Sequence, residues 1–275
     1  MKACIIIPAR YGSSRYRGKP LAKILGREMV LRVADICSNV VNKKNLFIAT
    51  DSKKISNVIK KAHYNVLMTS SRCLTGTDRV AEASKKLKSN IFVNVQGDEP
   101  TINPNDIKKI INAKIKFPNY VICGYDKVHK FEDATNSNVI KVVVNEKKEL
   151  IYMSRSLIPG SKKKVIEYEY LKQVCIYAFN KNELSKFCLK NKKSQTESME
   201  DIEILRFFDV GVKIKMIKLN SNSVAVDELK DVKKAERLIK IKNKKWTLKI
   251  NLYFNKMKFI ELKKIYIFDL DGVLI

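Results

Sequence analysis

The chain opens with Cys4-Ile5-Ile6-Ile7-Pro8, a short apolar run that is preceded by a single charged residue and ends in proline. A signal peptide needs a longer apolar stretch, so this run predicts a buried first strand over Cys4–Ile7. The strand leads directly into Pro8–Leu21, a segment with two glycines and four cationic side chains. The stretch therefore predicts a sheet whose first strand ends in a positively charged loop.

Short apolar runs alternate with amphipathic runs along the first 120 residues. Strands are predicted at Leu46–Ala49, Asn65–Thr69 and Ile91–Val95, and helices at Met29–Asn39, Ile55–Ala62, Asp78–Leu87 and Pro104–Lys116. Such alternation indicates βαβ crossovers and a mostly parallel sheet flanked by helices. Further along, we expect strands at Val139–Val144, Cys175–Phe179 and Lys213–Ile217, and helices at Glu200–Phe208 and Asp231–Ile239.

The composition narrows the class of protein. A length of 275 residues allows one large domain or two small ones, and a hydrophobic fraction of 45% excludes a wholly disordered chain. The formal net charge is +27, and the lysines that dominate it are spread along the chain. A nucleic-acid-binding protein more often gathers arginines and aromatics on one element, so we expect no specific nucleic-acid partner. A basic nucleic-acid binder stays an alternative, and an anionic substrate would be attracted by the same field.

The cysteines indicate the redox compartment, and the lengths of the apolar runs decide whether a membrane span is expected. Six cysteines are scattered without a C-x-x-C pair, which favours free thiols in a reducing compartment, hence the cytoplasm. With only two histidines, a multi-histidine zinc site is not expected. No run approaches the roughly 20 apolar residues of a membrane span, so we expect none.

The loop after the first strand has the composition of an anion-binding segment. Ligands of open α/β sheets bind at the carboxyl ends of strands, where this loop is expected to lie. Gly12 and Gly18 permit sharp turns and close approach to a ligand. The loop carries four cationic side chains, those of Arg10, Arg15, Arg17 and Lys19. Cations packed this closely repel one another unless an anion neutralises them. The spacing fits neither the Walker loop nor the dinucleotide fingerprint, so the loop predicts a phosphate site of another type.

An acidic motif, Gln96-Gly97-Asp98-Glu99-Pro100, follows the predicted strand at Ile91–Val95. Mg²⁺ prefers one or two carboxylates together with substrate phosphates, so Asp98 would need few protein partners. The alternative is a turn whose residues suit the backbone geometry. The cationic loop upstream favours the interpretation as a metal site.

These motifs resemble those of the 3-deoxy-manno-octulosonate (Kdo) cytidylyltransferases, a family of sugar nucleotidyltransferases. The resemblance rests on Ile7-Pro8-Ala9-Arg10 with Gly18-Lys19-Pro20-Leu21, on Thr75-Gly76-Thr77-Asp78-Arg79, and on Asn94–Pro100, which reads N-V-Q-G-D-E-P. It extends to Asn138–Val143 (N-x-V-K-V-V), Tyr152–Pro159 (Y-[FM]-S-R-x-x-I-P) and Glu197–Arg206 (E-x-x-E-x-x-E-x-L-R). In all it covers about residues 2–239.

The resemblance implies a Rossmann-like nucleotidyltransferase fold of the α/β class, with a small extension for sugar binding and dimerisation. It implies transfer of a cytidylyl group from CTP to Kdo, giving CMP-Kdo and pyrophosphate, for lipopolysaccharide or capsule biosynthesis. The implied partners are CTP, an acid sugar and a second copy of the chain, and the implied cofactor is Mg²⁺.

The resemblance also assigns roles to residues. Catalysis is assigned to Arg10, Lys19 and Asp98, and the metal to Asp98 and Asp227. The implied nucleotide-binding residues are Ala9, Arg10, Arg15, Lys19, Thr75, Gly76, Thr77, Arg79, Gln96 and Asp98. The implied sugar-acid-binding residues are Gln96, Arg155, Gln173, Tyr177 and Glu200. From the residues themselves, Thr77 is also a candidate helix N-cap, and the carboxylates of 197–203 at spacings of three would share one helical face.

Two departures from the family pattern concern the site. Gln173 stands where the family commonly has histidine, so it can hydrogen-bond a sugar hydroxyl but cannot carry charge. Val226-Asp227-Glu228-Leu229 stands where the family has V-D-T-P. Because of Gln173, the alternative substrate is another acid sugar, an 8-amino-octulosonate or a sialic-type acid.

The end of the sequence carries a different motif. Phe268-Asp269-Leu270-Asp271-Gly272-Val273 resembles motif one of haloacid-dehalogenase-type phosphatases, in which Asp269 would be the nucleophile and Asp271 the acid/base. A phosphatase needs further strands and residues, so we interpret this as a truncated or vestigial fragment, with a phosphatase as a less favoured function. The predicted organisation is a cytidylyltransferase domain at 1–239, a basic linker at 240–264 and the fragment at 265–275.

Overall fold

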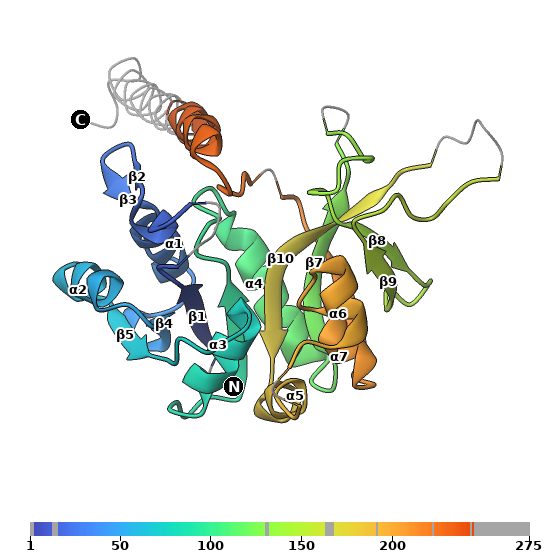
Figure 1. Ribbon diagram of the computed structural model, residues 1–275, viewed down its shortest axis with the longest axis horizontal. Helices are drawn as coiled ribbons and strands as arrows, with labels where there is room; N and C mark the ends of the chain where they lie inside the picture. Colours follow the sequence, from blue (N-terminus) through green and yellow to red (C-terminus); the bar gives the residue numbers. More distant parts are fainter. Residues whose placement is uncertain are drawn as a thin grey trace, which may run out of the picture.

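The computed structural model describes residues 3–12, 16–129, 132–162, 168–190, 192–221, 223–242 and 244 (Figure 1). The predicted phosphatase-like fragment at 265–275 and nearly all of the predicted linker at 240–264 lie outside the described residues. Residues 229–242 form one helix, so the helix expected at Asp231–Ile239 is present and continues past the predicted domain boundary.

A nine-stranded sheet forms the centre of the fold, and its main path runs β11-β7-β10-β6-β1-β4-β5. The bounds are β1 (Ala3–Ala9), β4 (Leu46–Thr50), β5 (Asn65–Met68), β6 (Ile91–Val95), β7 (Val121–Lys127), β10 (Leu171–Phe179) and β11 (Ile214–Lys218). All of these neighbours pair in parallel except β10, which is antiparallel to both β6 and β7. The predicted mostly parallel sheet is confirmed.

A small antiparallel extension adjoins this sheet. Strand β8 (Lys141–Val144) pairs with the start of β10 and with β9 (Leu150–Ser154), and Figure 1 shows the two strands to the right of β10. A separate two-stranded ribbon, β2 (Lys23–Ile24) with β3 (Arg27–Glu28), precedes the first helix.

Helices cover both faces of the sheet, and alternate residues of β1 pack against each layer. Ile5 and Ile7 join one apolar cluster with α1 (Met29–Ser38), α2 (Lys53–Lys61) and α4 (Pro104–Lys116). Cys4 and Ile6 join a second cluster with α3 (Gly76–Ser84), α5 (Lys181–Phe187) and α7 (Leu205–Asp209). A strand that is buried on both sides reads as a continuous apolar run, which is why this segment lacks polar alternation.

Two local predictions are wrong. The helix expected at Glu200–Phe208 is two short helices, α6 (Gln195–Glu200) and α7, because Asp201 takes a left-handed conformation with φ 50° between them. The carboxylates of 197–203 therefore do not share one helical face. The N-cap of α3 is Thr75 and not Thr77, since the Thr75 hydroxyl accepts from the Asp78 amide at 3.2 Å.

Candidate active site

A cavity of about 410 Å³ lies at the carboxyl ends of β1 and β6, where the sequence predicted ligand binding. Gly97 makes this arrangement possible, because a Cβ there would lie 2.9 Å from the Pro8 carbonyl oxygen. The predicted residues that line the cavity are Ala9, Arg10, Lys19, Thr75, Gly76, Arg79, Gln96, Asp98, Arg155, Gln173, Tyr177 and Asp227. Segments that are far apart in the sequence thus meet at one site.

Lys19 joins the cationic loop to the two predicted metal ligands. Its Nζ lies 2.6 Å from Asp98 Oδ2 and 3.3 Å from Asp227 Oδ1. Burial lowers the pKa of Lys19, but attraction to Asp98 and then Asp227 outweighs burial and leaves that pKa above its usual value. The lysine therefore stays cationic at neutral pH and can attract a phosphate while it keeps both carboxylates in place.

The same two carboxylates fit a magnesium ion by their chemistry. Asp98 and Asp227 converge on one point, and both supply the hard oxygen ligands that Mg²⁺ prefers. Among the described residues no group of three or more His, Cys, Asp or Glu side chains could hold a metal. A magnesium ion at this position would therefore depend on two carboxylates and on oxygens of its substrate.

The segment at 75–79 is fixed by hydrogen bonds before any ligand arrives. Thr75 and Asp78 form a capping box at the start of α3, in which the Thr75 amide donates to Asp78 Oδ2 at 2.8 Å. Arg79 is buried and donates to Thr69 Oγ1 at 2.5 Å and to Asp51 Oδ2 at 3.3 Å. Thr77 is fully buried and does not line the cavity. Several predicted nucleotide-binding side chains thus shape the backbone of the segment.

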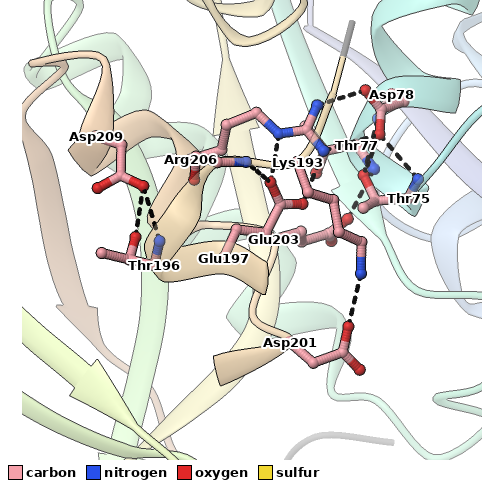
Figure 2. Close-up of polar contacts among 11 residues, drawn as sticks. Thr75, Thr77, Asp78, Lys193, Thr196, Glu197, Asp201, Glu203, Arg206 and Asp209 are labelled. Carbon is pink, nitrogen blue, oxygen red and sulfur yellow. Dashed lines mark hydrogen bonds and ion pairs between the residues drawn. The ribbon is translucent and has the colours of Figure 1, made fainter. Parts of the chain in front are cut away.

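Glu203 connects this segment to the acidic motif, as Figure 2 shows in part. Its Oε2 accepts from the Thr77 amide at 2.9 Å, and its Oε1 accepts from Gln96 Nε2 at 2.9 Å. Burial raises the pKa of the Glu203 carboxyl. Since Nε2 of Gln96 is used by Glu203, its amide oxygen is left as the acceptor for another donor.

A buried ion-pair network joins α3, α6 and α7. The guanidinium of Arg206 lies between Asp78 at 2.7 Å and Glu197 at 2.6 Å (Figure 2). It also stacks over the Phe187 ring, 3.9 Å from the ring centroid. Burial lowers the pKa of Arg206, but the hydrogen bonds to Glu197 and Asp78 hold it above its usual value. Removing one partner of such a network leaves a buried charge unpaired, at a cost of about 3–5 kcal/mol.

A second cavity of about 310 Å³ shares Ile140, Arg155, Gln173, Cys175 and Asp227 with the first. Its remaining walls come from Glu99, Glu132, Asn138, Val139, Lys172, Val174, Ser221, Ser223 and Ala225. The shared residues form the boundary between the two spaces. A ligand with two parts could therefore occupy both cavities.

The predicted sugar-acid residues do not all line the cavities. Gln173 lies at the boundary, and its Nε2 donates to the Tyr177 hydroxyl at 3.2 Å. Glu200 lines neither cavity, and instead accepts from Ser154 Oγ at 2.6 Å and from the Arg155 amide at 2.8 Å. Glu200 therefore supports the backbone of Arg155. Arg15 lies outside the described residues.

Sequence reasoning did not assign a role to several cavity residues. Lys193, Glu197, Asp201 and Glu203 all line the larger cavity. The E-x-x-E-x-x-E-x-L-R pattern was the available signal, but its spacing alone does not predict which of these carboxylates contacts the cavity or which partner each one binds. Glu203 is the most consequential of these residues because it contacts two predicted nucleotide-binding residues.

Solved structures show the class of this fold. The structure of CMP:2-keto-3-deoxy-manno-octonic acid synthetase complexed with CTP matches with a TM-score of 0.81 and 32% identity, over 88% of this chain and 100% of that chain. The inositol-1-phosphate CTP transferase from T. maritima matches with a TM-score of 0.60 at 18% identity over 87% of this chain and 95% of that one, which shows the fold alone. The chain is a nucleotidyltransferase.

Sequence comparison narrows this class. The cytidylyltransferase family model matches residues 4–214. The mitochondrial 3-deoxy-manno-octulosonate cytidylyltransferase of Arabidopsis thaliana is 35% identical over 86% of this chain and 83% of its own length, and the Escherichia coli enzyme of that name is 32% identical over 82% and 91%. An 8-amino-3,8-dideoxy-manno-octulosonate cytidylyltransferase from Shewanella sp. is 35% identical over 86% and 98%. The chain belongs to the cytidylyltransferase family.

Proposed function

We propose that this protein transfers the cytidylyl group of CTP to 3-deoxy-D-manno-octulosonate, giving CMP-Kdo and pyrophosphate. The observation that carries the proposal is the pair of joined cavities, with Lys19 and Asp98 in the larger one and Asp227, Arg155 and Gln173 at the boundary. Relatives named for this reaction support it at 32–35% identity.

In this reaction the anomeric hydroxyl oxygen of the sugar bonds to the α-phosphorus of CTP. The bond from that phosphorus to the pyrophosphate oxygen breaks, pyrophosphate leaves with the bonding electron pair, and the hydroxyl proton passes to water. Lys19 and Arg10, which both line the larger cavity, neutralise the charge of the triphosphate. Transfers of this kind depend mainly on positioning and on stabilising charge.

Magnesium is the proposed cofactor, with Asp98 and Asp227 as its protein ligands. When bound, the ion would polarise oxygens of the phosphate and of the sugar hydroxyl. Lys19 keeps the two carboxylates together through its contacts at 2.6 Å and 3.3 Å. The protein's own contribution is thus to present two oxygen ligands beside a fixed cation.

On the sugar side, Arg155 is the proposed partner of the sugar carboxylate. A guanidinium has five N–H donors, of which three are used by the carbonyls of Ser137, Glu200 and Asp201. One N–H remains on each terminal nitrogen, and a carboxylate can accept from both. Gln173 would contact a sugar hydroxyl.

The second candidate substrate is an 8-amino-octulosonate. Gln173 differs from the residue expected for Kdo enzymes. In addition, the match to a relative named for the 8-amino sugar covers 98% of that relative's length. Pyrophosphate release with CTP is to be measured across Kdo, the 8-amino sugar and a sialic-type acid. The greatest kcat/KM is expected with Kdo, and release with none of the acids would refute the proposed function.

We further propose a cytoplasmic homodimer. The six cysteines are free, and three of them, Cys4, Cys37 and Cys123, are buried, as suits a reducing compartment.

Exposed Ile151, Met199 and Phe208 on β9, α6 and α7 supply apolar surface for a second copy. None of the described helices is long and apolar enough to cross a membrane. Sedimentation equilibrium tests the dimer, which a concentration-independent monomer would refute.

A further inference from the structure

Lys141 on β8 is a fully buried lysine that the proposed chemistry does not use. Its side chain is 0% exposed, and its Nζ donates to the backbone carbonyls of Val139 and Arg155 at 2.6 Å each and of Asn136 at 3.1 Å. An ammonium group has three N–H donors, so all of them are used. Lys141 therefore has no donor left for a ligand, and any effect on a ligand must pass through the backbone that it holds.

The backbone that Lys141 holds belongs to the boundary between the two cavities. Arg155 lines both cavities, and Asn138 and Val139 line the smaller one. Arg155 in turn donates from its guanidinium to the Ser137 carbonyl at 3.0 Å. The loop at 136–139 is thus held by two cations, one of which is the proposed partner of the sugar carboxylate.

The electrostatic cost of this arrangement is substantial. Burying a cation is unfavourable unless hydrogen bonds compensate. Burial, and then repulsion from Arg155, lowers the pKa of Lys141, while Asp133 and Glu200 oppose that change. An apolar side chain of similar length would avoid the cost but would remove one hydrogen bond from each of three carbonyl oxygens. The arrangement is therefore suited to gathering these carbonyls at defined positions.

We propose that Lys141 is a positioning residue of the acid-sugar site, which fixes Arg155 and the loop at 136–139 so that the guanidinium faces the sugar carboxylate. The inference rests on the proposed function. Of its partners, Val139 lines only the smaller cavity and Arg155 lines both, whereas Lys19 and the segment at 75–79 line only the larger one. The loss of Lys141 should consequently affect the acid sugar and spare CTP.

Lys141→Met tests the proposal, and Lys114→Met is its matched control. Lys114 is also buried, donates to the carbonyls of Pro118 and Tyr120, and pairs with Glu183, but it lines neither cavity. Kinetics of pyrophosphate release and calorimetric titration with Kdo are to be measured for both variants. Lys141→Met should raise the KM and Kd for Kdo about tenfold with the KM for CTP within twofold, whereas Lys114→Met should lower Tm and change neither KM.

A double-mutant cycle with Arg155→Ala separates positioning from general damage. If Lys141 acts through Arg155, adding Lys141→Met to Arg155→Ala should raise the KM for Kdo by less than twofold more. Additive effects, or equal effects on CTP and Kdo, would overturn the inference. Should Lys141→Met fail to fold, Lys141→Gln, which keeps two N–H donors, is measured in the same cycle with the same criteria. Absence of pyrophosphate release by the unmodified enzyme would instead overturn the proposed function, and this inference with it.

Discussion

Replacing Asp98 by asparagine tests the centre of the proposed site most directly. The change removes one negative charge and keeps the shape of the side chain. Asp98 Oδ2 lies 2.6 Å from Lys19 Nζ, and the same carboxylate is the proposed magnesium ligand. The backbone carbonyl of Asp98 accepts from the Val226 amide at 2.9 Å, and this contact does not involve the side chain. The fold should therefore survive.

The structure sets the size of the expected loss. A hydrogen bond to a charged group contributes about 1.5–3 kcal/mol. Losing the proposed contact to magnesium should therefore lower kcat/KM roughly ten- to a hundredfold, whereas the Lys19 contact is present without substrate and affects kcat/KM only through the position of the lysine. Asp227→Asn should cost less, because Asp227 lies 3.3 Å from the lysine and its side chain is 46% exposed, against 29% for Asp98.

The assay is pyrophosphate release from CTP and Kdo at saturating Mg²⁺, with thermal unfolding measured on the same samples. Because the Lys19–Asp98 pair is partly exposed, Asp98→Asn should change the free energy of unfolding by less than about 1 kcal/mol. A folded variant whose turnover stays within threefold of the unmodified enzyme would refute the role of Asp98. An effect of Asp227→Asn larger than that of Asp98→Asn would refute the ranking.

Three further substitutions and one truncation test other parts of the site. Arg10→Ala should raise the KM for CTP roughly ten- to a hundredfold and leave the KM for Kdo unchanged, and Arg155→Ala should raise the KM for Kdo and leave that for CTP unchanged. If both variants raise the KM for the same substrate, the proposed division of the cavity is wrong. Truncation after Lys240 should preserve transfer and cost about 1 kcal/mol of stability by chemical denaturation, because it removes the hydrogen bond that Lys242 Nζ donates to the Thr101 carbonyl; a folded but inactive product would show that the removed residues support the site. Glu203→Gln should lower kcat/KM about tenfold, because it removes the anionic acceptor that orients Gln96; unchanged kinetics would show that this orientation does not depend on Glu203.

Local pattern predicts the buried centre of the fold well. The strand at Ile91–Val95 and the helix at Pro104–Lys116 have the predicted bounds, because their apolar periodicity coincides with burial. Strand β7 was not predicted, although it lies inside the sheet, between β11 and β10. It contains Gly124 and the buried Asp126, whose Oδ2 accepts from the Ser221 amide at 2.8 Å. A partner so distant in the sequence cannot be inferred from local composition.

The segment at 197–203 shows why part of the site could not be predicted. A spacing of three suggests that the carboxylates of Glu197, Glu200 and Glu203 share one helical face. However, α6 ends at the left-handed Asp201, so the three carboxylates contact different partners. Glu197 pairs with Arg206 at 2.6 Å, Glu200 accepts from the Arg155 amide, and Glu203 accepts from an amide of α3. One short segment thus contacts both the proposed nucleotide end and the proposed sugar end of the joined cavities. Its conformation is determined by cations and amides from distant parts of the chain, and this places the two ends of the site relative to each other.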